Sequence, residues 1–93
     1  MTMEQMEPGS VQAYRAPGHR TFRLGRAVDR VLLIHGFPGT PWEVRRLGEE
    51  LATLGWEAHG PLLPGFGPNI SSLGSRRWAE WEETVQRAYS RLL

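Results

Sequence analysis

Four consecutive apolar residues at positions 31–34 run directly into the glycine-bearing turn His-Gly-Phe-Pro-Gly at 35–39. A short apolar run that ends at a turn is typical of a strand covered on both faces in a parallel sheet. Thr40, Pro41 and Glu43 then supply three agreeing helix-start signals, with Thr as the N-cap, Pro at the first helical position and Glu at the third. The segment therefore predicts a buried strand followed directly by a helix.

The helix is predicted over residues 41–54, and Gly55 ends it as a left-handed stop. Its apolar stripe follows spacings of three and four and comprises Val44, Leu47, Leu51 and Leu54. A second strand is predicted over residues 56–63. Strand, helix and strand joined by short connections form a right-handed parallel crossover in most proteins, so we expect an α/β fold with one parallel pair.

The flanking segments extend this unit. Residues 21–24 alternate polar and apolar and predict an edge strand, with a turn at Gly25 and Arg26 that directs the chain back. Ser75 is the expected cap of a last helix, in which Glu83 and Arg87 form a favourable i to i+4 pair. Its expected buried stripe is Trp78, Trp81, Val85, Ala88 or Tyr89, and Leu92. Residues 1–20 carry two Pro-Gly pairs and no periodicity, and we expect a mobile leader there.

Composition limits the function classes. The 93 residues allow at most one domain, and without cysteine the chain has no disulfide, thiol nucleophile or thiolate metal site. A net charge of +1 gives no case for nucleic acid, and no apolar run is long enough for an integral membrane segment or a signal peptide, so a cytoplasmic protein is expected. The histidines, His19, His35 and His59, include no short-spaced pair, and we expect no metal site.

The turn at 35–39 is the candidate for chemistry. It lies at the carboxyl end of a buried strand, where open parallel sheets bind their ligands. Gly36 and Gly39 let the backbone turn sharply and leave the Phe37 amide free to point at a ligand oxygen. A preorganised amide of this kind is what an oxyanion hole requires.

Four motifs in this order carry a family resemblance. They are His35-Gly36-Phe37, the helix pattern Leu47-Gly48-Glu49-Glu50-Leu51, the loop Pro61-Leu62-Leu63-Pro64-Gly65-Phe66-Gly67, and the Trp-bearing stretch Arg76-Arg77-Trp78-Ala79-Glu80-Trp81. Together they resemble the N-terminal part of α/β-hydrolase fold serine hydrolases, in the carboxylesterase and monoacylglycerol lipase branch. The resemblance implies that residues 21–93 form a partial domain with an incomplete sheet, truncated before the nucleophile elbow.

The resemblance also implies roles. Phe37 would donate its main-chain N–H to the oxyanion and place its ring beside the acyl pocket, while His35, Gly36 and Gly39 would shape the loop. The nucleophile belongs in Gly-x-Ser-x-Gly, followed by an acid and a His. None of the serines has both glycines, so no nucleophile, acid or base is expected in this chain. The implied full-length enzyme cleaves a small ester or an acyl lipid without a cofactor, and the isolated chain is expected to be inactive.

Two alternatives stay open. The epoxide hydrolase and dehalogenase branch of the same fold also carries His-Gly-Phe-Pro, but it has an Asp and an Arg where this chain has Leu62, Leu63 and Pro64. The other alternative is a truncated, non-catalytic binding or assembly module. An incomplete sheet would leave an exposed edge, through which such a module could associate with itself.

Overall fold

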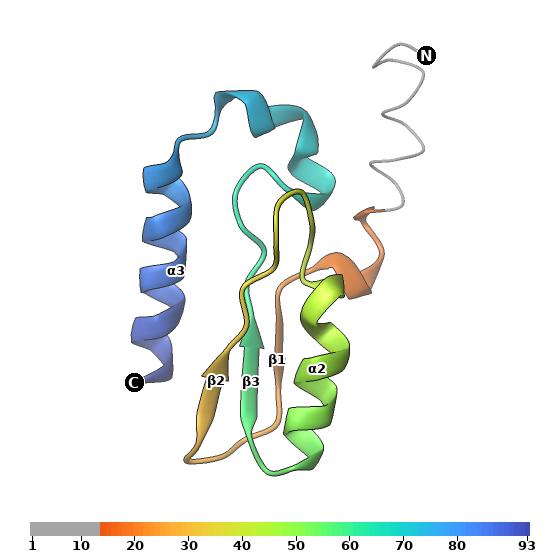
Figure 1. Ribbon diagram of the computed structural model, residues 1–93, viewed down its shortest axis with the longest axis vertical. Coiled ribbons are helices and arrows are strands. Elements are labelled where there is room, and N and C mark those ends of the chain that lie inside the picture. The colour runs from red at the N-terminus through yellow and green to blue at the C-terminus, as the bar shows by residue number, and fades with distance from the viewer. Residues whose placement is uncertain (1–13) are drawn as a thin grey trace.

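The computed structural model describes residues 14–93 and shows a small sheet between helices (Figure 1). Two strands precede the first long helix, and one follows it. The elements in chain order are η1 (Pro17–His19), β1 (Phe22–Leu24), β2 (Arg30–Leu32), α2 (Trp42–Thr53), β3 (Glu57–Gly60), η2 (Gly67–Ser75) and α3 (Trp78–Leu92). The expected α/β class is confirmed.

The last strand along the chain, β3, occupies the centre of the sheet. The order is β1-β3-β2, in which β2 pairs parallel to β3 and β1 pairs antiparallel to it. The predicted parallel crossover is thus confirmed, and β1 is an edge strand as expected. The turn at Gly25 does not return the chain into a β1–β2 hairpin, because β3 lies between these two strands.

One face of the sheet packs against α2, and the Phe22 ring lies at the centre of this contact. Phe22 of β1 is only 5% exposed. A Cβ added to Gly48 of α2 would lie 2.7 Å from its Cε1 atom, and a Cβ added to Gly60 of β3 would also collide with the ring. Glycine at these two positions is what allows helix, ring and strand to approach so closely.

The opposite face of the sheet, covered by α3, carries charge. Glu57 of β3 is buried and pairs with Arg23 at 2.6 Å and with Arg30 at 3.1 Å. The hydrogen bond from Arg23 and the nearby guanidinium charges hold the pKa of Glu57 below its ordinary value of 4.5. Arg30 also donates to the Leu92 carbonyl at 2.6 Å, which ties the end of α3 to β2.

Helix α2 matches its predicted bounds to within a residue, but its buried face is shifted. Pro41 and not the predicted Thr40 stands at the N-cap of α2, although Thr40 Oγ1 still accepts a hydrogen bond from the Trp42 N–H at 3.2 Å. Leu47 and Leu54 of the predicted stripe are exposed, whereas Gly48 is buried against Phe22. The predicted buried face was wrong at Leu47 and Leu54. Hydrophobic periodicity counts only apolar side chains, so it misses a glycine that packs closely against a neighbour.

Helix α3 begins later than expected and is capped differently. The Ser75 hydroxyl donates to the Ser72 carbonyl inside η2, so Ser75 does not cap α3. Glu80 reaches back instead, and its Oε2 accepts from the Arg77 N–H at 2.9 Å. The predicted Glu83–Arg87 ion pair is not formed, as the ion pairs among residues 14–93 do not include it.

The stripe of α3 is confirmed in its second half. Ala88 and Leu92 are buried, and Trp81 and Val85 are partly buried. Trp78 is 69% exposed and was wrongly placed in the core. Tyr89, the alternative to Ala88, is also exposed.

Most of the proposed leader, residues 1–13, lies outside the described residues. Its last part includes η1, where His19 Nδ1 lies 2.8 Å from Thr40 Oγ1 and the His19 ring lies 5.5 Å from that of Trp42. Among residues 14–93, neither α2 nor α3 combines the length and the apolar character that crossing a bilayer requires.

Candidate functional site

The loop between β2 and α2 lies at the carboxyl end of the parallel pair, as the sequence predicts (Figure 1). The Leu33 N–H donates to the His59 carbonyl at 2.8 Å and extends the pairing one residue beyond β2. The chain then leaves the sheet, turns at 37–38 through a cis peptide bond, and enters α2. The loop is therefore anchored to the central strand at one end and to a helix at the other.

Phe37 presents an unused donor. Among residues 14–93, its main-chain N–H forms no hydrogen bond with a backbone or side-chain acceptor. The residue is 72% exposed, and its ring meets the buried ring of Phe66 edge-on, with 5.6 Å between the centroids. A free amide beside an exposed ring at the carboxyl edge of a sheet can donate to an oxygen that approaches from outside.

His35 fixes the 35–39 loop through both of its ring nitrogens. It is buried, and its Nε2 accepts from the Leu63 N–H at 3.1 Å. Because Nε2 is the acceptor, the proton lies on Nδ1, which donates to the Gly36 carbonyl at 3.0 Å. Both ring nitrogens are thereby used within the protein. His35 connects the 35–39 loop to the segment that follows β3, a structural role.

Gly36 and Gly39 do not use the backbone freedom that is specific to glycine. Neither has a positive φ, in contrast to Gly65 and Gly67. A Cβ added to Gly39 would overlap the carboxylate of Glu43, which turns back from the first turn of α2 toward the loop. A Cβ added to Gly36 would make only an ordinary contact with Glu43 Oε2 at 3.7 Å, and the role of the two glycines in shaping the loop stays a prediction.

Two aromatic residues that the sequence did not assign to the site support it. Phe66, almost fully buried, contacts His35, Phe37 and Trp81, with ring centroids 5.2, 5.6 and 5.8 Å away. The Trp81 Nε1–H donates to the Pro64 carbonyl at 2.8 Å. The glycine-rich loop after β3 thus places the Phe66 ring in contact with Phe37. The sequence from Pro64 to Gly67 predicts a loop, but it does not indicate that Phe66 contacts the other aromatic rings.

The serines of residues 14–93 lie away from the histidines. Ser71, Ser72 and Ser75 lie in η2 and Ser90 lies in α3, and no serine in residues 14–93 hydrogen-bonds to a histidine. The same residues contain no group of three His, Asp or Glu side chains that could hold a metal ion.

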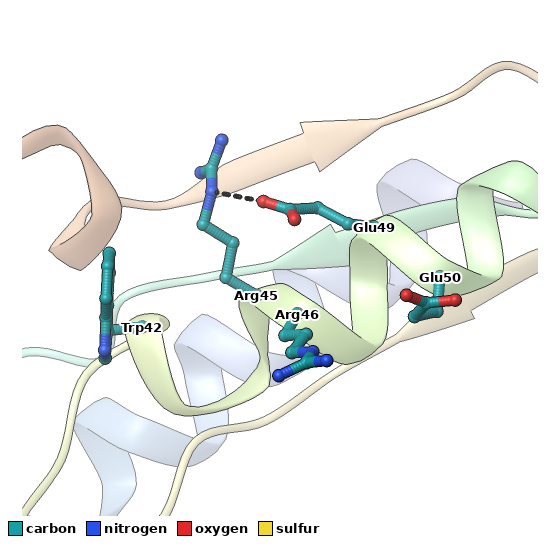
Figure 2. A pocket seen from close by; sticks show the side chains of 5 residues that line it. All are labelled: Trp42, Arg45, Arg46, Glu49 and Glu50. Carbon is teal, nitrogen blue, oxygen red and sulfur yellow. Dashed lines mark hydrogen bonds and ion pairs between the residues drawn. The ribbon is translucent and has the colours of Figure 1, made fainter.

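A separate hollow of about 390 Å³ lies on the outer surface of α2 (Figure 2). It is lined by Trp42, Arg45, Arg46, Glu49 and Glu50, and Arg45 pairs with Glu49 at 3.1 Å. None of the residues of the 35–39 loop lines it. Its ion pair is the ordinary i to i+4 kind of a solvated helix face, and it adds nothing to the Phe37 site.

Comparison with known proteins finds sequence relatives of this chain. No protein-family model matches the chain. The thermostable monoacylglycerol lipase of Bacillus sp. (strain H-257) is 36% identical over 59 residues, which are 63% of this chain and 24% of the lipase. The carboxylesterase of Bacillus subtilis (strain 168) is 36% identical over 62 residues, which are 67% of this chain and 25% of the esterase.

A solved structure agrees with these relatives. A chain from the work on LipS and LipT, two metagenome-derived lipolytic enzymes, superposes with a TM-score of 0.76 at 28% sequence identity. The match covers 82% of this chain and 31% of the other. The present chain spans about a quarter of the length of the curated relatives it matches. Together these relatives support an α/β-hydrolase fragment that is similar to esterases and lipases.

Proposed function

We propose that this chain supplies the oxyanion-hole loop of a serine hydrolase that cleaves carboxylic esters. The observation that carries the proposal is the Phe37 N–H, which lacks an acceptor among residues 14–93 and lies at the carboxyl end of β2. The relatives are named as a monoacylglycerol lipase and a carboxylesterase, which supports an acyl lipid or a small ester as substrate over an epoxide or a haloalkane.

In this mechanism a serine attacks the ester carbonyl, a histidine transfers the proton, and an acidic residue orients that histidine. The carbonyl oxygen becomes negatively charged as the tetrahedral intermediate forms. The Phe37 N–H donates to this oxygen, and its position is set in advance by the contact with Phe66 and by the bridge through His35. No serine of this chain lies in Gly-x-Ser-x-Gly, so we propose that the 93 residues alone do not hydrolyse esters.

The oxyanion role is tested in a chimera. The matched segment of the Bacillus monoacylglycerol lipase is replaced by that of this chain, and hydrolysis of p-nitrophenyl butyrate is measured. Phe37→Pro removes the N–H and the ring together, whereas Phe37→Ala removes the ring and keeps the N–H. The proline variant should lose about 10²- to 10³-fold in kcat relative to the alanine variant, the usual effect of one oxyanion donor.

Equal kcat values for the two variants, in chimeras of equal melting temperature, would refute the donor role of Phe37. The 93-residue chain by itself is assayed in parallel. Hydrolysis by the pure chain above that of its own Phe37→Pro variant would contradict the proposed inactivity.

A further inference from the structure

His59 is a buried titratable group that the proposed ester chemistry does not use. It lies in the central strand, is 3% exposed, and its Nδ1 is buried without a hydrogen-bond partner among residues 14–93. Buried ring nitrogens are usually hydrogen-bonded, so the unpartnered Nδ1 is an exception in this fold. Burial and the positive charges of Arg23 and Arg91 hold the pKa of His59 below 6.5. At pH 7 the ring is therefore neutral and has one N–H to donate.

This side chain lines a hollow of about 210 Å³ between the sheet and α3. We name it the His59 pocket, and its polar lining is Thr21, His59, Thr84, Arg87 and Arg91. A water molecule takes up about 30 Å³ of liquid, so the pocket has room for a larger polar group. None of its lining residues belongs to the 35–39 loop, which makes it a separate site.

The free polar atoms of the pocket are mainly donors. Thr21 Oγ1 already accepts from the Leu62 N–H at 2.8 Å, which leaves its hydroxyl proton to donate. Thr84 uses its own proton on the Glu80 carbonyl at 2.9 Å. Within residues 14–93, neither Arg87 nor Arg91 forms an ion pair or a side-chain hydrogen bond. The pocket thus combines two guanidinium groups with a hydroxyl and an imidazole donor.

The carboxylate nearest to His59 in the sequence is engaged by other arginines. Glu57 lies on the same face of the sheet, two residues before His59, but its carboxylate is already paired with Arg23 and Arg30. The charged side chains that line the pocket are both arginines, so its lining carries a net positive charge. An occupant has to be an anion that accepts several hydrogen bonds at once.

We propose that the His59 pocket binds a phosphate group. Its oxygens would accept from the Arg87 and Arg91 guanidinium groups, whose planar forks match phosphate geometry, and from the Thr21 hydroxyl and the His59 ring. The source of the group is free inorganic phosphate or a small phosphate monoester. The assignment stands independently of the proposed ester hydrolysis, because no residue is shared between the two sites.

The test uses the full 93-residue chain labelled with ¹⁵N. Sodium phosphate is titrated at pH 7 and constant ionic strength, and the His59 ring and the α3 amides are followed by NMR. Saturable shifts at these groups are expected. Arg87→Gln and Arg91→Gln should each weaken binding by at least about tenfold, as expected when one charge-assisted contact is lost. Arg46→Gln, which removes the same charge from α2 on the other face of the sheet, should change it by less than about twofold.

Two further probes identify the chemistry. Glycerol 3-phosphate that binds at least as tightly as inorganic phosphate would support a monoester, and weaker binding would support the free ion. Acetate that binds as tightly as phosphate would overturn the assignment. Shifts that do not saturate, or an Arg46→Gln effect as large as those of the two α3 variants, would also overturn it. The melting temperature of each variant provides a second readout, since at a given concentration phosphate should raise it less in the two α3 variants than in the wild type and in Arg46→Gln.

Discussion

The contact between Gly48 and the Phe22 ring predicts an inverted response to a common stabilising substitution. Replacing a glycine by alanine inside a helix ordinarily stabilises a protein by about 1 kcal/mol. A Cβ at Gly48 would lie 2.7 Å from Phe22 Cε1 and 3.1 Å from Cζ, well inside the roughly 3.5 to 4.0 Å of a favourable carbon contact. Overpacking of this kind costs about 1 to 3 kcal/mol. Gly48→Ala should therefore destabilise the chain by about 1 kcal/mol in net terms.

The background Phe22→Leu separates these two contributions. Leucine lacks both ring atoms that the new methyl group would meet, so in this background only the helix propensity gain of about 1 kcal/mol should remain. The two measurements of Gly48→Ala should then differ by about 2 kcal/mol, within the range found for residues in direct contact.

Urea unfolding followed by tryptophan fluorescence gives the four free energies. With a slope of about 1 kcal/mol per molar urea, Gly48→Ala should lower the midpoint by about 1 M in the wild-type background and raise it by about 1 M in the Phe22→Leu background. Equal effects of Gly48→Ala in the two backgrounds would refute the contact between Phe22 and Gly48. That result would also remove the explanation given above for the exposed leucines of α2.

Two further predictions concern polar groups. Because Arg23 and Arg30 lower the pKa of Glu57, ionised Glu57 stabilises the fold above pH 4.5, and this contribution is lost as the pH falls through the lower pKa of the folded state. The melting temperature of Glu57→Gln should consequently fall less than that of the wild type between pH 5 and pH 3, and parallel curves would argue against the ion pairs. Trp81→Phe keeps an aromatic ring near Phe66 but leaves the Pro64 carbonyl without its donor, and it should cost about 1 kcal/mol in urea unfolding. No change would mean that water replaces the indole N–H.

The local elements of this fold could be predicted from the sequence because their signals are local. The apolar run at 31–34 and the start signals at Thr40 and Pro41 placed a strand and a helix to within one or two residues. The family resemblance identified the Phe37 loop, whose position at the carboxyl end of β2 the structure agrees with. Whether its amide serves as an oxyanion donor is left to the chimera experiment.

The remaining features depend on contacts between distant segments. Gly65 and Gly67 marked a turn, but the helix η2 and the packing of Phe66 under the loop depend on α3 and its Trp81. Glu57 and His59 are polar, and their burial could not be expected from their own residue types. Glu57 is buried because two arginines meet its carboxylate from other strands.

The central place of β3 also determines the order in which the sheet can assemble. Phe22 pairs with Gly60 and Arg30 pairs with Glu57, so β1 and β2 have no strand partner until the chain beyond α2 has been made. No hairpin can act as an early nucleus, and each pairing closes a loop of roughly 25 to 40 residues, which slows folding. During synthesis α2 can form first, and β1 and β2 remain exposed to other chains until β3 emerges from the ribosome.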